Sequence, residues 1–205
     1  MEQRRGIRRF GERGFTLLEV LVVVAVIGIM ALWGYPALLN TLNRVKLTGI
    51  ARETSILMHQ ARMEAIKRAL NTEVLYLDEA NCAGGLGCFI AFVDVDGDGA
   101  FISGLDDVVG GPIPLPNGVD LRAPGELKEG GSAIDAWDDA PNANDGPVYN
   151  TDGSVAKAGA FRLADGRGNY IEVRIEFLGT GKPTLQKYDG AAWWENGELG
   201  NTWEW

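Results

Sequence analysis

The sequence predicts an α+β fold, in which a long N-terminal helix, membrane-embedded in its first half, packs on a C-terminal antiparallel β-sheet head. An uncharged run from Val20 to Leu39 follows a basic leader. Apolar residues then recur at helical spacing, and after Asn71 short β-type runs alternate with Gly, Asp and Pro clusters. We expect four segments: a leader (1–14), a transmembrane helix (15–39), its amphipathic continuation (40–70) and a β-rich head (71–205).

The leader and the apolar run indicate a retained membrane anchor. Residues 1–14 hold five Arg against two Glu, and such an excess beside a first apolar helix keeps that side cytoplasmic. The run has twenty residues and, at about 1.5 Å per residue, can just span a hydrocarbon core. A secretory signal would end in a small-x-small cleavage site, but Trp33-Gly34-Tyr35-Pro36 stands at that place.

Glu19 places a carboxylate at the start of this helix. Near mid-helix a carboxylate costs roughly 2.5–3.5 kcal/mol in lipid, and less toward the end, so Glu19 needs a compensating partner. An alternative is a plain single-pass anchor in which Glu19 reaches the membrane interface.

The basic leader, Gly14, Phe15, and Glu19 as the fifth residue after Gly14 resemble the class III (prepilin) signal of type IV pilins and type II secretion pseudopilins. The resemblance implies that prepilin peptidase cuts between Gly14 and Phe15 and that Phe15 is N-methylated. It also implies that Glu19 pairs with the ammonium group of Phe15 in a neighbouring subunit of a filament. We then expect a single inner-membrane span, with the N-terminus cytoplasmic and the head periplasmic.

Pro36 lacks a backbone donor and clashes with the preceding turn, so the sequence predicts a kinked or loosened helix there. In pilin-like proteins this stretch commonly unwinds on assembly, which makes Pro36 a candidate assembly residue. An inert kink in a buried helix is the alternative.

The segment 40–70 has an amphipathic pattern. Its stripe consists of Leu47, Ile50, Thr54, Leu57, Ala61, Ala65 and Ala69. His59 lies on the same segment, and no nucleophile or acidic partner is visible around it, which argues against catalysis.

The head is predicted to be built from short strands. The runs are Glu73–Leu77, Cys88–Val93, Val108–Ile113, Val119–Arg122, Pro147–Asn150, Ala160–Leu163, Tyr170–Phe177 and Thr184–Tyr188. In Tyr170–Phe177 apolar and charged residues alternate, which predicts a strand with one face in water.

Parts of the head resemble the GspH/FimT pseudopilins. The similar stretches are Gln60–Arg68 with the following strand, Phe89–Asp94 with Asp96-Gly97-Asp98-Gly99, and Val148–Gly153. This resemblance implies a minor pseudopilin whose partners are other pilin-like subunits, prepilin peptidase and the inner membrane.

The charge of the chain disfavours DNA as a partner. Its net charge is −9, and removal of residues 1–14 leaves 14 basic and 26 acidic groups, or −12. Phosphate-backbone binding depends on Lys and Arg. DNA-binding relatives are expected to carry a Gly-Arg-x-Arg-like motif near the C-terminus, whereas this tail is acidic and Trp-rich, with only Arg167 in a similar setting.

Cys82 and Cys88 are the only cysteines, and a loop with three glycines separates them. Beyond the membrane, disulfides persist, so we expect these two residues to pair; two buried free thiols are the alternative. They do not supply a zinc site, because the lone His59 is on a distant helix.

Asp94, Asp96 and Asp98, with Gly99 at the sixth position, match the first half of an EF-hand loop. The twelfth position is Leu105 rather than Glu, so Asp106 or Asp107 would have to substitute. Ca²⁺ is therefore the one candidate cofactor, and a metal-free polar turn is the alternative.

Two regions have no assigned role. Residues 122–147 are predicted to form a long acidic loop, either functional or solvated filler. The tail holds Trp193, Trp194, Trp203 and Trp205, which serve either as a contact surface or as packing for the tail's own sheet.

No enzyme motif is found. Gly179-Thr180-Gly181-Lys182 fails as a phosphate loop, because Pro183 follows the Lys and Glu176 stands where its first Gly belongs. Three hypotheses remain: a structural minor pseudopilin of a type II secretion system, a FimT-type minor type IV pilin in pilus assembly or DNA uptake, and a membrane-tethered ligand-binding module.

Overall fold

The computed structural model describes residues 15–78, 82, 87–97, 99, 101–121, 137, 146–188 and 193–195, without the side chains of residues 33–37. The chain divides into two units, residues 1–41 and residues 42–205.

The helix α1 runs from Leu17 to Arg68, over 52 residues. Thr16 caps its start, because the backbone N–H of Glu19 donates to Thr16 Oγ1 at 3.2 Å. The Glu19 carboxylate lies in the first turn, where the helix dipole favours negative charge. The helix ends at Ala69, which has a left-handed φ of 54°.

The second half of α1 buries the predicted stripe. Leu47, Ile50, Thr54, Leu57, Ala61 and Ala65 are all buried. Thr54 satisfies its hydroxyl by donating to the backbone oxygen of Ile50 at 2.9 Å. Ala69, the last member of the predicted stripe, is exposed because the helix has already ended there.

The described strands form two antiparallel sheets. The first has the order β3-β2-β1-β5, with β1 at Thr72–Leu77, β2 at Cys88–Val93, β3 at Asp107–Pro114 and β5 at Val148–Tyr149. The second has the order β4-β6-β7-β8-β9, with β4 at Asp120–Leu121, β6 at Gly159–Ala164, β7 at Tyr170–Ile175, β8 at Thr184–Tyr188 and β9 at Trp193–Glu195. The α+β prediction is confirmed, and every predicted run overlaps a strand. The division of the described strands into two sheets was not predicted.

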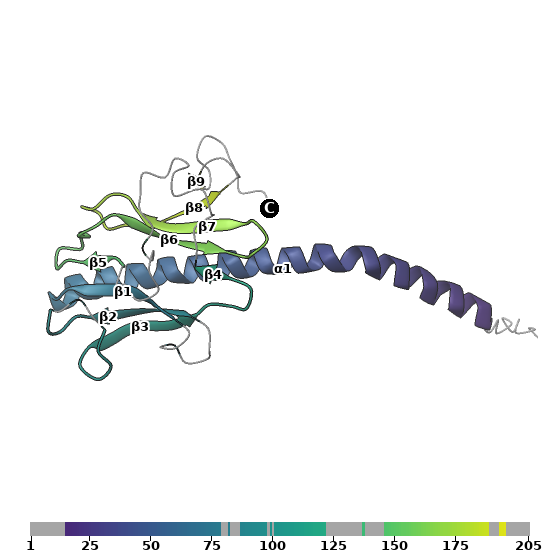
Figure 1. The fold of residues 1–205 in the computed structure, drawn as a ribbon, viewed down its shortest axis with the longest axis horizontal. Coiled ribbons are helices and arrows are strands. Elements are labelled where there is room, and N and C mark those ends of the chain that lie inside the picture. The colour runs from purple at the N-terminus through teal and green to yellow at the C-terminus, as the bar shows by residue number, and fades with distance from the viewer. Residues whose placement is uncertain are drawn as a thin grey trace, which may run out of the picture. The chain divides into compact units, whose positions relative to one another are not determined.

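The two sheets and α1 share one core. In Figure 1 the second half of α1 has β1–β3 on one side and β6–β8 on the other, and one buried cluster joins residues of all three. The rings of Phe89 on β2 and Phe161 on β6 lie 4.9 Å apart. Trp137 also packs on Phe161, at 5.0 Å, so this residue of the predicted acidic loop belongs to the core.

The prediction that Tyr170–Phe177 has one face in water is wrong. The strand ends at Ile175, and Glu172 and Arg174 on its charged face are buried. Arg162 Nε donates to Glu172 Oε2 at 3.1 Å, and Arg174 Nη1 donates to Glu172 Oε1 at 3.1 Å. Arg174 Nη1 also donates to Gln186 Oε1 at 2.8 Å. These bonds give the buried Glu172 carboxylate two cationic partners, because the register of β6 and β7 sets Arg162 opposite Glu172. Arg162 Nη1 and Arg174 Nε are buried without a hydrogen-bond partner among the described residues.

The Trp-rich tail contributes a strand that the sequence did not predict. β9 pairs with β8, and Trp193 is buried with its ring 5.4 Å from that of Tyr188. Trp194 lies opposite Lys187 in the same ladder. Packing of the tail on its own sheet is therefore correct for Trp193, whereas Trp194 is half-buried and Trp203 and Trp205 lie outside the described residues.

Cys82 and Cys88 form the predicted disulfide, with Cα atoms 5.9 Å apart. Both cysteines are buried against Leu75, Ile90 and Phe92 in a second apolar cluster. Cross-linking residues six positions apart limits the entropy of the unfolded chain.

Replacing both cysteines with serine is expected to lower the free energy of unfolding by about 2 kcal/mol, because the short loop is no longer closed in the unfolded state. Urea unfolding of residues 42–205, with and without the replacement, measures the difference. As a control, reductant should destabilise the unmodified protein by a similar amount and leave the variant unchanged. A variant as stable as the parent would contradict the assigned role of the bond.

Candidate functional site

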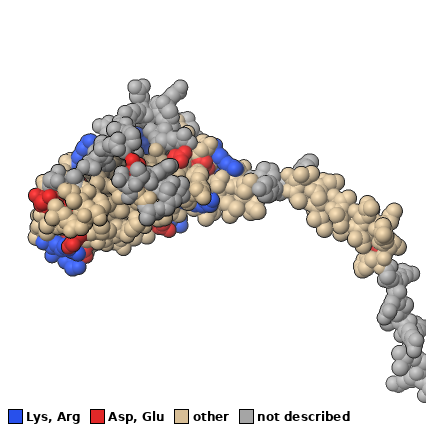
Figure 2. Space-filling view, turned by 60° about the horizontal axis from the view of Figure 1, so that its bottom comes forward, with Lys and Arg blue, Asp and Glu red and all other residues tan. Residues whose placement is uncertain are grey.

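The first unit presents a helix with an apolar surface. Every described side chain from Phe15 to Leu32 is exposed, and Phe15 is 81% exposed. Glu19 is the only charged residue between Phe15 and Thr41. Figure 2 shows this helix almost entirely in the colour of uncharged residues. Among the described residues, no helix is long and apolar enough to count as a membrane span.

The predicted processing and assembly residues lie along this helix or just before it. Gly14 and the rest of the leader lie outside the described residues. Phe15 directly precedes the cap Thr16, and Glu19 follows one turn later. α1 continues through Pro36 without a break in its backbone, so the loosening expected at Pro36 stays a prediction.

The loop between β2 and β3 gathers carboxylates. Oxygen atoms of Asp94, Asp96 and Asp106 lie within 4.8 Å of one another, and Asp94 and Asp106 are buried. Asp106 thus takes part, as one of the two substitutes considered from the sequence. Asp107 instead pairs with Arg68 at 2.9 Å, and Asp98 lies outside the described residues.

Backbone amides hold this loop closed. Asp94 accepts hydrogen bonds from the N–H groups of Gly97 and Gly99, at 2.7 and 3.1 Å. Asp106 accepts from Val95 at 3.2 Å and from Ile102 at 2.7 Å. Each carboxylate oxygen keeps a second lone pair, so the donor set also fits a hard cation such as Ca²⁺. Ca²⁺ binding here stays a prediction, with the polar turn as its alternative.

Calorimetry and thermal unfolding of residues 42–205 distinguish the two alternatives. A Ca²⁺ site predicts binding heat and a higher melting temperature in Ca²⁺ than in chelator, because a ligand that binds only the folded state stabilises it. Both effects should disappear in Asp106→Asn, which keeps an acceptor oxygen but removes a charge. Absence of heat and of a thermal shift would leave the polar turn.

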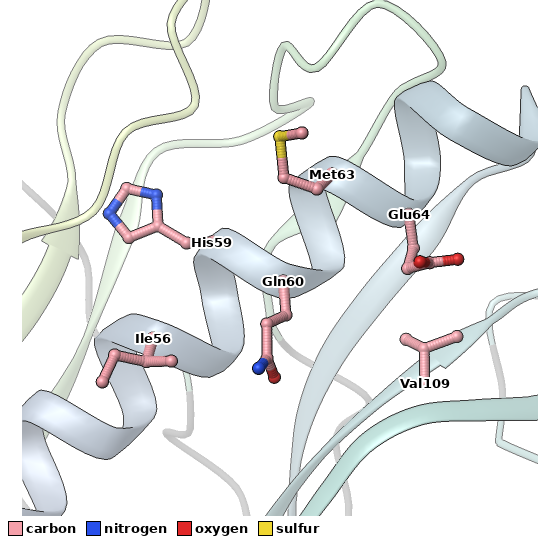
Figure 3. Close-up of a pocket in the computed structure, with 6 residues that line it drawn as sticks. All are labelled: Ile56, His59, Gln60, Met63, Glu64 and Val109. Carbon is pink, nitrogen blue, oxygen red and sulfur yellow. The ribbon is translucent and has the colours of Figure 1, made fainter.

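His59 is exposed on α1 and lines a hollow with Ile56, Gln60 and Met63. Partial burial and the nearby cations Arg62 and Lys182 lower the pKa of His59 below its ordinary value. The ring is therefore neutral at pH 7. Glu64 lines the same hollow (Figure 3), so an acidic residue lies nearer to His59 than the sequence argument assumed, and the absence of a catalytic role for His59 stays a prediction.

Sequence reasoning missed two features near these sites. Thr16 and Glu19 have the spacing of a capping box, and this signal could have identified the start of α1. The buried Arg162–Glu172–Arg174 cluster gave no local signal, because its members come from two strands.

A comparison with family models agrees with the prepilin signal. Residues 9–35 match the model described as the prokaryotic N-terminal methylation motif, and this stretch includes Gly14, Phe15 and Glu19. No curated protein and no solved structure matches the chain. The fold and the matched motif support a type IV pilin-like protein, a structural class that prepilin peptidase processes and that assembles with other pilin subunits.

Proposed function

We propose that the chain is a minor pseudopilin of a type II secretion system. Prepilin peptidase cuts between Gly14 and Phe15, Phe15 is N-methylated, and the mature subunit joins a short periplasmic pseudopilus. The match of residues 9–35 to the methylation motif is the observation that carries this proposal. The acidic head, which lacks an Arg-rich tail motif, favours secretion over DNA uptake.

The subunit crosses the inner membrane once, with its N-terminus in the cytoplasm and its head in the periplasm. The five Arg of the leader support this orientation, and the uncharged run from Val20 to Leu39 supports the anchor. The disulfide between Cys82 and Cys88 is consistent with an oxidising compartment around the head.

Glu19 serves assembly. Cleavage after Gly14 creates a new ammonium group on Phe15, and the carboxylate of Glu19 pairs with that group on a neighbouring subunit. The pair neutralises a charge that lipid or an apolar filament interior would otherwise penalise. The exposed apolar helix around Glu19 supports this role, because it provides a surface for neighbouring helices to cover.

Deletion of the gene in its host tests the proposal. We expect secreted proteins to accumulate in the periplasm while surface pili remain, and we expect the wild-type gene to restore secretion. Mass spectrometry of the restored protein should show N-methylated Phe15 at its N-terminus. Loss of pili with normal secretion would instead identify a FimT-type pilin.

The head is not expected to retain DNA. Residues 69–205 contain eight basic and 23 acidic groups, a net charge of −15, which repels phosphate. A gel shift of residues 42–205 with duplex and single-stranded DNA, at low and high salt, measures binding. Retention that weakens as salt rises would revive the DNA-uptake hypothesis.

A further inference from the structure

The first charged residues after the uncharged run of α1 are basic. Between Val20 and Arg52 the only charged residues are Arg44, Lys46 and Arg52, and the first acid that follows is Glu53. Arg44 and Lys46 come five and seven residues after the run ends, which corresponds to about 7–10 Å at the rise of an α-helix. The headgroup layer on each side of a bilayer is about 5–8 Å thick.

The direction of helical side chains brings these two cations closer to that layer. In an α-helix the Cα–Cβ bonds tilt toward the N-terminus, which for Arg44 and Lys46 is the direction of the uncharged run. Long basic side chains also extend toward a membrane interface. When the run spans a bilayer, both cations therefore reach the level of the lipid phosphates.

Arg44 lies on the core side of α1 but has no anionic partner there. It precedes Leu47 by three residues and Ala51 by seven, and both of these are fully buried, whereas Arg44 is half-buried. Arg44 Nε is buried and has no hydrogen-bond partner in the part of the chain that the structure describes. A donor of a charged group that is removed from water without an acceptor costs free energy. An anionic ligand at Arg44 would offset that cost.

Lys46 is held beside the turn that follows β3. Its Nζ donates to the backbone oxygen of Asn117 at 3.5 Å, and the turn is closed by a hydrogen bond from the N–H of Val119 to the oxygen of Pro116 at 3.0 Å. An ammonium group has three donors, so donors remain for a ligand. Lys46 also lines a hollow of about 220 Å³, and Glu53 lines the same hollow.

The acids near Lys46 do not stand between the two cations and the uncharged run. Glu53 is seven residues, or about 10 Å, farther along α1 than Lys46. Asp120 is exposed on β4, beyond the turn. In the proposed orientation Arg44 and Lys46 are periplasmic, on the side where Lys and Arg beside a span are otherwise depleted. Contacts with phosphate give these two cations a use on that side.

We propose that Arg44 and Lys46 bind the phosphate group of an anionic phospholipid in the periplasmic leaflet of the inner membrane. The inference rests on the membrane anchor of the proposed function. The planar guanidinium of Arg44 offers paired N–H donors that match phosphate oxygens, and the ammonium of Lys46 adds a second charge. A lipid is favoured over an acidic protein group because the two cations follow the apolar run directly. The contact ties the head to the membrane surface until the subunit leaves the bilayer.

The lipid selectivity of the full-length chain tests the proposal. Flotation with vesicles first checks the anchor. The chain is then purified in detergent and titrated with phosphatidylglycerol, phosphatidylcholine or diacylglycerol, and native mass spectrometry measures the bound lipid. The first lipid has an anionic phosphate, the second a phosphate neutralised by choline, and the third no phosphate. We expect phosphatidylglycerol to bind about tenfold tighter than phosphatidylcholine, and diacylglycerol to bind weakest.

Variants locate the site. Arg44→Gln and Lys46→Gln should each weaken the binding of phosphatidylglycerol about fivefold. Arg44→Lys keeps the charge without the guanidinium fork and should recover part of the loss. Arg52→Gln makes the same change at an exposed cation of α1 and should leave binding unchanged, because Arg52 lies more than a Debye length, about 8 Å, beyond Lys46.

Thermal unfolding in detergent provides a second readout and confirms that each variant is folded. Phosphatidylglycerol should raise the melting temperature of the parent more than that of Arg44→Gln, because a ligand that binds only the folded state stabilises it. Without lipid the two proteins should unfold at the same temperature, since Arg44 Nε has no hydrogen bond to lose in the described structure. An equal destabilisation of Arg44→Gln with and without lipid would assign Arg44 an intrachain role and overturn the proposal.

Equal binding of phosphatidylglycerol and phosphatidylcholine would overturn the selection of an anionic lipid, and unchanged binding in Arg44→Gln would overturn the site. Inorganic phosphate that displaces phosphatidylglycerol at an equal concentration would overturn a lipid as the source of the phosphate. A chain that does not float with vesicles would contradict the anchor of the proposed function together with this site. Loss of lipid selectivity in a chain that floats would contradict the site alone, and the deletion experiment tests secretion separately.

Discussion

Glu19→Ala is expected to leave membrane insertion and cleavage after Gly14 intact and to reduce incorporation into filaments about tenfold or more. A hydrogen bond to a charged group contributes about 1.5–3 kcal/mol, and each 1.4 kcal/mol corresponds to a factor of ten. The same loss of binding free energy recurs at every contact with a neighbouring subunit. Sheared pseudopili or cross-linked membranes, probed for the subunit, measure incorporation against the total processed protein.

The hydrogen bonding at the start of α1 indicates that Glu19→Ala leaves the helix undisturbed. Thr16 Oγ1 accepts a hydrogen bond from the backbone N–H of Glu19, and alanine retains that donor. The helix therefore still begins at Leu17, and the change removes chiefly the carboxylate.

Two further variants separate charge from helix capping. Glu19→Gln removes the charge at nearly constant shape and should assemble as poorly as Glu19→Ala. Thr16→Val removes the capping oxygen, which costs about 1 kcal/mol of helix stability, but keeps the carboxylate and should assemble far better. Normal incorporation of Glu19→Ala would contradict the pairing of Glu19 with the ammonium group of Phe15 in a neighbouring subunit.

Local pattern in the sequence predicted most of the helix and strands. The stripe from Leu47 to Ala65 was correct because burial on one face of a helix follows directly from residue spacing. Ala69 departed from it because the helix ends there, and an alanine carries no stop signal. The split of the strands into two sheets was not predictable, because strand order depends on contacts distant in sequence.

The candidate sites also differ in how far the local sequence predicts them. The spacing from Gly14 to Glu19 is local, and it was enough to predict the N-terminal methylation motif that residues 9–35 match. The carboxylate cluster in the loop between β2 and β3 was predicted only in part. Asp106 approaches Asp94 only when that loop closes through hydrogen bonds to backbone amides. Ile56 and Met63 also follow a helical period, but only the structure shows that they are exposed.

The alternation in β7 shows why charge pattern alone misleads. Glu172 and Arg174 alternate with Ile171, Val173 and Ile175, which normally indicates one face in water. Arg162 on β6 and Gln186 on β8 come from other strands, and they give Glu172 and Arg174 hydrogen-bond partners inside the protein. A buried ion pair of this kind is recognisable only when strand register is known.

Arg162→Met is expected to lower the free energy of unfolding by about 3–5 kcal/mol at pH 7, because it leaves part of a buried charge uncompensated. Arg162 is 2% exposed and Glu172 is fully buried. Arg162 also lies with its guanidinium 5.8 Å from the ring of Trp193, so the variant should loosen the contact with β9. Urea unfolding of residues 42–205, followed by tryptophan fluorescence, measures both effects.

The loss of unfolding free energy caused by Arg162→Met should be smaller at acid pH. Burial raises the pKa of Glu172, and Arg174 and Arg162 oppose that rise. Removing Arg162 lets the pKa rise further. A carboxyl whose pKa is raised by folding destabilises the folded state as pH climbs from its ordinary value of 4.5 through the raised one. The gap between variant and parent should therefore be smaller at pH 4, where Glu172 is increasingly protonated, than at pH 7.

Matched variants isolate the ion pair. Arg52→Met makes the same chemical change at an exposed site and should alter stability by less than about 0.5 kcal/mol. Arg162→Met combined with Glu172→Gln removes both charges of the pair while the amide oxygen still accepts from Arg174, so this double variant should recover part of the loss. If Arg162→Met alone cost as little as Arg52→Met, the burial of Glu172 would need an explanation other than pairing with Arg162. The pH dependence decides between these outcomes, since a simple packing defect would destabilise the protein equally at pH 4 and pH 7.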